Sequence, residues 1–294
     1  MSKTSRGGAT TAPAAGPIEP GLYPDLSAEA YHADRASLSS SGARKILDTC
    51  PALFRYEQDR PQPPKKTFDF GHAAHREVLG DGPELVVIDA PRWDTNELKA
   101  EVAAARAAGA VPLKQHEYDQ VQDMAAAIRR HPQAAVLFAP GSGRPELSGF
   151  WTDGPTGVTR RVRFDWMPNP RQGRLIIPDY KTCVSAAHDD LEKAMASYGY
   201  HQQAEWYRTG ATALGLGDET TAFVFVCQEK TPPYLVTVFQ PSATAMRIAA
   251  AKNRRALQVF AECVESDRWP AYSDDVAYLS LPPWAEKRET EEYL

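Results

Sequence analysis

Three segments with the pattern of β-strands follow one another between residues 145 and 181, after a first part whose pattern is mostly helical. Turn-forming residues separate these segments, at Asp153-Gly154-Pro155 and at Pro168-Asn169-Pro170. A helix and then further strands follow, so the chain must build a sheet that helices cover, and the pattern predicts a mixed α/β domain. The expected strands cover residues 145–152, 158–167, 173–181, 220–228 and 234–240, and the expected later helices cover 188–209 and 242–265.

The first part of the chain predicts a set of helices. A serine-rich segment at 37–41 precedes apolar residues at helical spacing, and Pro51 can open a second short helix. Three further helices are expected at residues 69–80, 95–108 and 115–130. We therefore predict one ordered domain over residues 21–285, with a mostly helical part at 21–144, a core at 145–265, a disordered tail at 1–20 and a second tail at 286–294.

The charge and the cysteines limit the classes of protein. The net charge is −5, from 33 basic and 38 acidic residues, which argues against a protein that coats nucleic acid over its whole surface. A local basic groove stays compatible with this balance. The four cysteines are far apart, with no CxxC pair, so we expect reduced thiols and no iron–sulfur cluster. Without an apolar run of about 20 residues or a signal peptide, a soluble cytoplasmic protein with no membrane contact is expected.

The strand expected at 173–181 ends in charged residues. Alternation along a strand places Asp179 and Lys181 on one face, together with the apolar residues Leu175 and Ile177. The apolar half would be buried, while the far end would offer a carboxylate beside an ammonium group. A triplet of this kind is expected about once by chance in a chain of this composition. Its place at a strand end distinguishes it from Glu97-Leu98-Lys99, which lies in an expected helix where such positions do not face each other.

Two earlier strands add charged side chains. Arg161, Arg163 and Asp165 share one face of their strand, and Glu146 opens the strand before it. If the strands are neighbours, three carboxylates and one lysine meet at one edge of the sheet. Carboxylate oxygens bind Mg²⁺, the ion activates a water, and a lysine can orient or deprotonate that water or stabilise charge at phosphorus. The pattern is therefore typical of phosphodiester hydrolysis; the two arginines could contact phosphate or form a solvated edge.

Several motifs resemble one nuclease family. Pro178-Asp179-Tyr180-Lys181-Thr182, with Arg163-Phe164-Asp165 upstream, looks like the RecE-type exonucleases of phages and prophages, members of the PD-(D/E)xK superfamily related to lambda exonuclease and RecB-like nucleases. The similarity spans roughly residues 22–285. The other segments that resemble the family are Gly71–His75 (G-x-x-x-H), Glu146–Trp151 (E-x-S-x-x-W), Tyr200–Tyr207 (Q-x-x-x-Y), Leu38–Ser41, Gln228–Lys230 and Leu281–Trp284.

The resemblance implies a fold and a site. The fold would be a restriction-endonuclease-like αβββαβ core, with a mixed central sheet and an N-terminal helical elaboration. The ion would be Mg²⁺, with Mn²⁺ as a substitute. The implied metal ligands are His75, Glu146, Asp165, Asp179 and the backbone carbonyl of Tyr180; these side chains and Lys181 would be catalytic; and the residues implied to contact DNA are Arg161, Arg163, Gln203 and Tyr207.

The resemblance also implies an activity: Mg²⁺-dependent degradation of linear double-stranded DNA from an end, 5′→3′, in phage-type homologous recombination inside a bacterial host cell. A ring-shaped homo-oligomer, trimer or tetramer, and a single-strand annealing protein as partner would accompany it. Two alternatives stay open. An endonuclease or single-strand nuclease can use the same fold. A catalytically inert DNA-end-binding module would be expected to lack a ligand, whereas Glu146, Asp165, Asp179 and Lys181 are all present.

Overall fold

The computed structural model describes residues 18–60 and 66–294, so most of the tail predicted at 1–20 lies outside the described residues. Each predicted strand is present, with ends that differ by no more than three residues. The central strands are β5 (Gly143–Thr152), β6 (Thr159–Pro168), β7 (Ile176–Cys183), β8 (Ala222–Glu229) and β9 (Val236–Phe239); the shorter ones are β1 (Gly21–Tyr23), β2 (Leu38–Ser39), β3 (Leu85–Val87) and β4 (Val111–Leu113).

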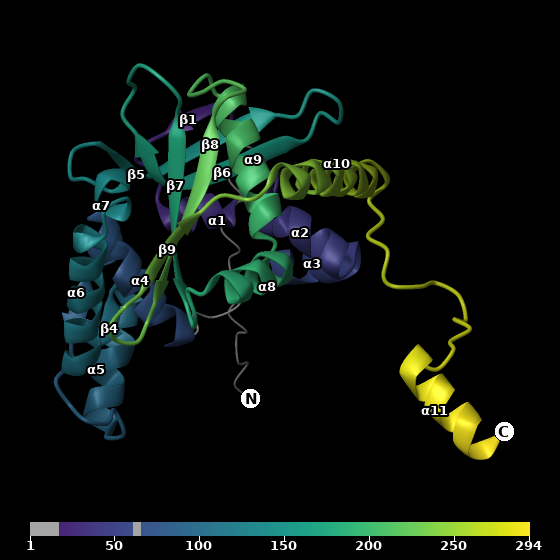
Figure 1. The fold of residues 1–294 in the computed structure, drawn as a ribbon, viewed down its shortest axis with the longest axis horizontal. Helices are drawn as coiled ribbons and strands as arrows, with labels where there is room; N and C mark the ends of the chain where they lie inside the picture. Colours follow the sequence, from purple (N-terminus) through teal and green to yellow (C-terminus); the bar gives the residue numbers. More distant parts are fainter. Residues whose placement is uncertain (1–17, 61–65) are drawn as a thin grey trace, which may run out of the picture.

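Hydrogen bonding groups these strands into sheets of mixed direction, as predicted. One sheet has the order β1-β5-β6-β2 and a second has the order β7-β8-β9, while β3 and β4 form a separate parallel pair. The β5–β6 pair is antiparallel and the β7–β8 pair is parallel. Strands β6 and β7 lie side by side, so the two larger sheets meet at this junction (Figure 1).

All but one of the predicted helices are also present. Helices expected at 69–80, 95–108, 115–130 and 242–265 match α4, α5, α6 and α10, and the Glu97-Leu98-Lys99 triplet lies in α5 as expected. The helices are α1 (Ala28–Ala33), α2 (Ser40–Asp48), α3 (Pro51–Asp59), α4 (Lys66–Leu79), α5 (Asn96–Ala107), α6 (Gln115–Arg130), α7 (Ala134–Leu137), α8 (His188–Tyr198), α9 (Tyr200–Ala213), α10 (Ala243–Ser266) and α11 (Pro283–Tyr293).

The single helix predicted over 188–209 is wrong, because the segment forms two helices, α8 and α9. Gly199 between them has φ +65° and ψ +34°, a left-handed conformation that glycine adopts without a steric penalty. This residue ends α8 and lets α9 start in a new direction. The pattern also did not predict α1, the β3–β4 pair, α7 or α11, all of which are short or lie outside the main periodic segments.

Helices cover the junction of the two sheets on both sides (Figure 1). On one side, α2, α9 and α10 pack against a core that includes Trp206, Phe164 and Ile177. On the other side, α4 and α6 pack against a core that includes Tyr180 and Val226. Strand β7 therefore contributes alternate residues to two cores, which explains why both of its faces are largely buried.

The C-terminal part leaves this body. After α10 the chain runs in an extended path to α11, which lies apart from the rest of the molecule (Figure 1). The tail predicted at 286–294 falls mostly within α11, where Pro283 occupies a first-turn position that suits proline. Within the described ranges, no helix is both long enough and apolar enough to span a membrane.

Candidate active site

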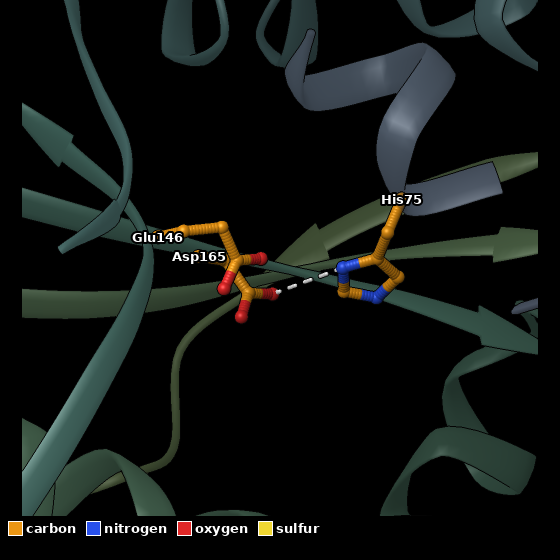
Figure 2. A group of neighbouring side chains, drawn as sticks. All are labelled: His75, Glu146 and Asp165. Carbon is orange, nitrogen blue, oxygen red and sulfur yellow. Dashed lines mark ion pairs between the residues drawn. The ribbon is translucent and has the colours of Figure 1, made fainter. Parts of the chain in front are cut away.

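Three potential metal ligands from separate elements meet at the sheet junction. His75 comes from α4, Glu146 from β5 and Asp165 from β6, and one ligand atom of each lies within 4.8 Å of the others. The three side chains point toward one another (Figure 2), with 3.7 Å between His75 Nδ1 and a carboxylate oxygen of Asp165. We refer to these residues as the ligand triad.

The register of β5 and β6 aligns the two carboxylates. Pro145 pairs with Trp166 and Leu147 pairs with Phe164, so Glu146 lies opposite Asp165 between these pairs. Glu146 has φ +54°, which side chains other than glycine rarely adopt. Backbone conformations of this kind carry a cost and are concentrated at functional sites. The strained backbone at Glu146 thus belongs to the arrangement that brings its carboxylate into the ligand triad.

Asp165 also joins the two sheets. One of its carboxylate oxygens accepts a hydrogen bond from the backbone N–H of Tyr180 on β7, at 3.0 Å. The ring of Tyr180 contacts the ring of His75, with 5.1 Å between their centroids. A side chain of β6 therefore takes a backbone partner from β7, and this contact fixes both the carboxylate and the path of the neighbouring strand.

A second group of charged and polar side chains lies on β7 and α9. Asp179 is only 1% exposed, and one of its oxygens accepts a hydrogen bond from the side-chain amide of Gln203 at 2.6 Å. Its other oxygen forms an ion pair with Lys181. Asp179 and Lys181 share a face of β7, as strand alternation predicted. Among the described residues Asp179 stands outside the three-residue ligand cluster; we refer to Asp179, Lys181 and Gln203 as the lysine group.

Burial shifts the pKa values of the titratable groups. Burial raises the pKa of Asp165 to about 6, with repulsion from Glu146 adding to it, and raises the pKa of Asp179 to about 6, with repulsion from Asp165 adding to it. Burial, assisted by the charge of Lys181, lowers the pKa of His75 to about 4. For Lys181, burial disfavours the charge, but Asp179 and Asp165 outweigh it and raise the pKa. Near pH 7 the imidazole is therefore neutral and the lysine is charged.

These properties fit a divalent cation at the ligand triad. Two carboxylates and a neutral imidazole are oxygen and nitrogen donors suited to Mg²⁺ or Mn²⁺. Glu146 repels Asp165, whose pKa is raised chiefly by burial, so a positive charge placed between the two carboxylates would stabilise the charged form of Asp165. The triad thus has both the donors and the electrostatic need for such an ion.

The two arginines predicted to contact DNA are engaged within the protein. Arg161 is 8% exposed, and its guanidinium donates to the Asp34 carboxylate at 3.1 Å and to Ser37 at 3.3 Å. Arg163 forms an ion pair with Glu146 and donates to the Leu26 carbonyl at 2.8 Å. Arg163 therefore holds a member of the ligand triad, and Arg161 holds the segment that precedes β2.

A cleft of about 330 Å³ opens onto the ligand triad. Gln203 and Tyr207, one turn apart on α9, both line it, and the Tyr207 ring packs edge-to-face on Phe164 at 5.5 Å. Sequence reasoning had assigned no role to several other residues of its wall. The residues that line the cleft are Tyr31, His32, Ser39, Ser40, Ser41, Arg44, Glu146, Arg161, Arg163, Asp165, Gln203 and Tyr207.

The added residues come from the N-terminal helices. Ser39 caps α2, accepting the Gly42 N–H at 3.2 Å, and the neighbouring serines and Arg44 follow on the same helix. The segment Leu38–Ser41 resembles the nuclease family in sequence, and this resemblance was the one sequence signal that pointed to this part of the cleft wall. His32 lies on α1, which the sequence pattern did not predict, so no signal pointed to it.

Helices, three strands, a helical segment and a further strand, with carboxylates and a lysine at the sheet junction, define a PD-(D/E)xK nuclease fold. Residues 39–282 match the sequence profile of a family described as "PDDEXK-like domain of unknown function (DUF3799)". The match covers most of the chain, and the protein belongs to this family. The predicted restriction-endonuclease-like fold and PD-(D/E)xK superfamily are thereby confirmed.

Several solved structures are similar to this chain. The crystal structure named "Putative exonuclease" from Eubacterium rectale has a TM-score of 0.56 at 13% identity, covering 89% of this chain and 98% of that one, and at this identity it supports the fold alone. The crystal structure of SSO0001 has a TM-score of 0.33 at 14% identity, over 76% of this chain and 77% of that one, which is too low to support an argument. None of the curated proteins matches the sequence.

Proposed function

We propose that this protein is a metal-dependent exodeoxyribonuclease that hydrolyses linear double-stranded DNA from an end. The observation that carries the proposal is the convergence of the ligand triad beside the lysine group, with Glu146, Asp165 and Gln203 in the wall of a cleft that also carries hydroxyl and guanidinium groups. The name of the Eubacterium rectale protein, which shares the fold, agrees with this choice within the nuclease class.

His75, Glu146 and Asp165 would hold the ion. A bound divalent cation supplies an activated water and neutralises charge on the phosphate. The neutral imidazole of His75 is ready to donate its lone pair, and the carboxylates lose their mutual repulsion on binding. The family resemblance implies Asp179 and the Tyr180 carbonyl as further ligands. Both lie on β7, the strand beside that of Asp165, and we include them in the proposal.

The environment of Lys181 favours one of the roles open to it. Its ion pair with Asp179 keeps the ammonium charged, because losing the proton would leave a buried carboxylate without a counter-charge. A general base would have to lose that proton near neutral pH. Lys181 therefore acts as a fixed positive charge that orients the attacking water and stabilises the negative charge developing at phosphorus.

The cleft wall would position the DNA strand. Ser39, Ser41 and Arg44 offer hydroxyl and guanidinium donors on the side of the cleft formed by α2. Such donors bind phosphate oxygens without regard to base sequence, which suits an enzyme that degrades whatever strand enters. Arg161 and Arg163, held by carboxylates of the protein, would support this wall and add positive potential.

Three finer features belong to the same proposal and rest on the RecE resemblance alone. They are 5′→3′ polarity in phage-type recombination, a ring-shaped trimer or tetramer around DNA, and a single-strand annealing protein as partner. An endonuclease would use the same ligand triad. The two activities differ in whether cleavage requires a free end of the DNA.

The test uses linear and covalently closed circular duplexes of equal sequence, incubated with Mg²⁺, Mn²⁺, Ca²⁺ or EDTA. We expect degradation of the linear duplex with Mg²⁺ and Mn²⁺, little turnover with Ca²⁺, whose looser coordination positions water poorly, and none in EDTA. Lys181→Ala should be inactive, and Lys193→Ala, an exposed lysine on α8, serves as the matched control. Nicking of closed circles would contradict the exonuclease proposal, and equal cleavage in EDTA would contradict metal dependence.

A further inference from the structure

The C-terminal arm, residues 271–294, carries large apolar side chains that nothing in the described chain covers. Val276 and Tyr278 are 101% and 99% exposed, Leu279 is 84% exposed and Trp284 is 68% exposed. The arm extends from the end of α10 and places α11 well away from the body (Figure 1). Large exposed apolar side chains gathered on one short segment indicate an interaction surface.

The direction in which the arm leaves is fixed by packed contacts. The ring of Trp269 lies 6.0 Å from that of Phe54 and 5.8 Å from that of Phe260, and the Pro270 carbonyl accepts a hydrogen bond from the Ala52 N–H at 3.1 Å. The twelve residues from 271 to 282 can span about 40 Å when extended. The arm therefore starts from a firm base and has the reach to meet another molecule.

The charge of the arm argues against nucleic acid as its partner. Its aromatic residues could stack on bases, but the arm has two basic residues, Lys287 and Arg288, against six acidic ones. DNA binding depends on neutralising phosphates with lysine and arginine, so an acidic arm would be repelled. A surface that is apolar and basic is the complement that the arm requires. The acidic residues are Asp274, Asp275, Glu286, Glu289, Glu291 and Glu292.

The outer face of α10 has this character. Its inner face packs into the core, whereas Ile248 is 52% exposed on the outside, and three exposed arginines lie around it. Among the described residues none of these arginines forms an ion pair with a carboxylate. Arg254 and Arg255 follow Arg247 by seven and eight residues, about two helical turns, so an apolar centre is bordered by positive charge.

We propose that the C-terminal arm of one copy of this chain docks on the outer face of α10 of a second copy. The apolar side chains of the arm would cover Ile248, and the glutamates of α11 would meet the three arginines. Each copy has one arm and one acceptor face, so the contact is heterologous and generates a closed ring or a reciprocal exchange of arms. The proposal rests on the ring-shaped oligomer of the proposed function and assigns a contact to it, while its readout is mass and does not depend on nuclease activity.

The first measurement is the molar mass of the full chain in solution, by light scattering and sedimentation over a range of concentrations. We expect an oligomer, and we expect the double variant Leu279→Ser/Trp284→Ser to weaken self-association by about 100-fold or more, since buried aromatic anchors dominate interface energies. Val136→Ser, which changes a valine on α7 that is 67% exposed, is the matched control and should leave the mass unchanged. A monomeric wild-type chain, or a double variant that associates like the wild type, would overturn the proposal.

A mixing experiment identifies the acceptor. Arg254→Glu/Arg255→Glu should also be monomeric, because it places glutamates opposite an acidic arm. Mixing this variant, which keeps its arm, with Leu279→Ser/Trp284→Ser, which keeps its acceptor face, should give a one-to-one dimer and nothing larger. If the mixture stays monomeric, the arm folds on its own chain or binds another protein, and docking between copies is wrong. Because the readout is mass, its failure is separate from any failure of the nuclease assay.

Discussion

The ligand triad has its carboxylates on β5 and β6, and the lysine group has its charged residues on the neighbouring β7, yet the charges of the two groups are satisfied differently. In the lysine group, both oxygens of the Asp179 carboxylate have partners, one in Gln203 and one in Lys181. In the ligand triad, Asp165 and Glu146 repel each other, and the neighbouring imidazole of His75 is neutral near pH 7. The lysine group pairs its charges within the protein, whereas in the ligand triad Glu146 pairs with Arg163 but the two carboxylates still repel each other, a repulsion that a bound cation would offset.

This difference separates two tasks in the site. The ligand triad faces the cleft through Glu146 and Asp165, so an ion bound there would also reach a substrate. In the lysine group the Asp179 carboxylate is buried and holds Lys181 charged and in place, in addition to the role of metal ligand proposed for it. Substitutions in the ligand triad should therefore reduce metal binding, whereas substitution of Lys181 should reduce turnover with the metal still bound.

The largest effect is expected for Asp165→Asn. Because this substitution removes a charged ligand from the centre of the triad, Mn²⁺ affinity and cleavage should both fall by more than about 100-fold. Mn²⁺ titration by calorimetry and cleavage of a linear duplex measure the two quantities. Asp190→Asn, on the exposed surface of α8, is the control and should change neither. Retained Mn²⁺ affinity in Asp165→Asn would show that the ion binds elsewhere.

Lys181→Met should come next. Loss of the fixed positive charge should reduce turnover by about 100- to 1,000-fold with near-normal Mn²⁺ affinity. The unpaired Asp179 carboxylate should also destabilise the fold by about 3 kcal/mol. The pKa of Asp179 is raised already and would rise further, so this destabilisation is present when the carboxylate is charged and is lost as the pH falls below the folded pKa.

Urea unfolding of Lys181→Met at pH 8 and at pH 5 checks the second part, and we expect the larger loss at pH 8. Lys181→Arg keeps the charge and should recover the stability but only part of the turnover, because the guanidinium is larger. An equal loss of stability at both pH values would mean that the ion pair is not the source of the effect.

A smaller effect concerns the stability of the metal-free protein. The folded pKa of Asp165, about 6, is above its unfolded value, so its stabilising contribution is complete below about pH 4 and is lost as the pH rises through 6. Asp165→Asn should therefore unfold with a free energy about 1–2 kcal/mol higher than wild type in EDTA at pH 7.5, and with no gain at pH 4.

With saturating Mg²⁺ at pH 7.5, the wild type should instead have the higher free energy of unfolding, because the ion stabilises only the folded wild type. Unfolding curves in urea, with EDTA or with Mg²⁺, provide the comparison. If the substitution lowers the unfolding free energy in EDTA at pH 7.5, then the carboxylate of Asp165 is not under electrostatic strain, and the contrast between the two groups is incorrect.

The smallest effect should come from Gln203→Ala. Its amide holds one oxygen of Asp179 at 2.6 Å, so its loss should reduce turnover by about 10-fold through misplacement of Asp179 and Lys181. Tyr207→Phe, one turn further along α9 and also at the cleft, keeps the ring packing on Phe164 and should stay within a few-fold of wild type. A larger loss for Tyr207→Phe than for Gln203→Ala would place the phenol, rather than the amide, in the reaction.

Much of the fold followed from local patterns. Alternation defined β5, β6 and β7 and put Asp179 and Lys181 on one face, and helical spacing defined α6. The division between α8 and α9 was missed because Gly199 adopts its left-handed conformation within an otherwise continuous helical pattern. The ion pairs of Arg161 and Arg163 could not be predicted either, since their partners, Asp34 and Glu146, come from other parts of the chain.

The sequence by itself determined the elements and the chemical groups available: a strand that ends in Asp179 and Lys181, carboxylates on two earlier strands, and a histidine on a helix. Periodicity is a local property, so these features could be found from neighbouring residues. Only the tertiary structure decided which of these side chains lie together. It placed Asp165 beside His75 and Glu146, and it paired Asp179 with Lys181 and Gln203. Burial and contacts between distant segments set these partnerships, and the burial of Asp165 beside Glu146 favours a bound cation.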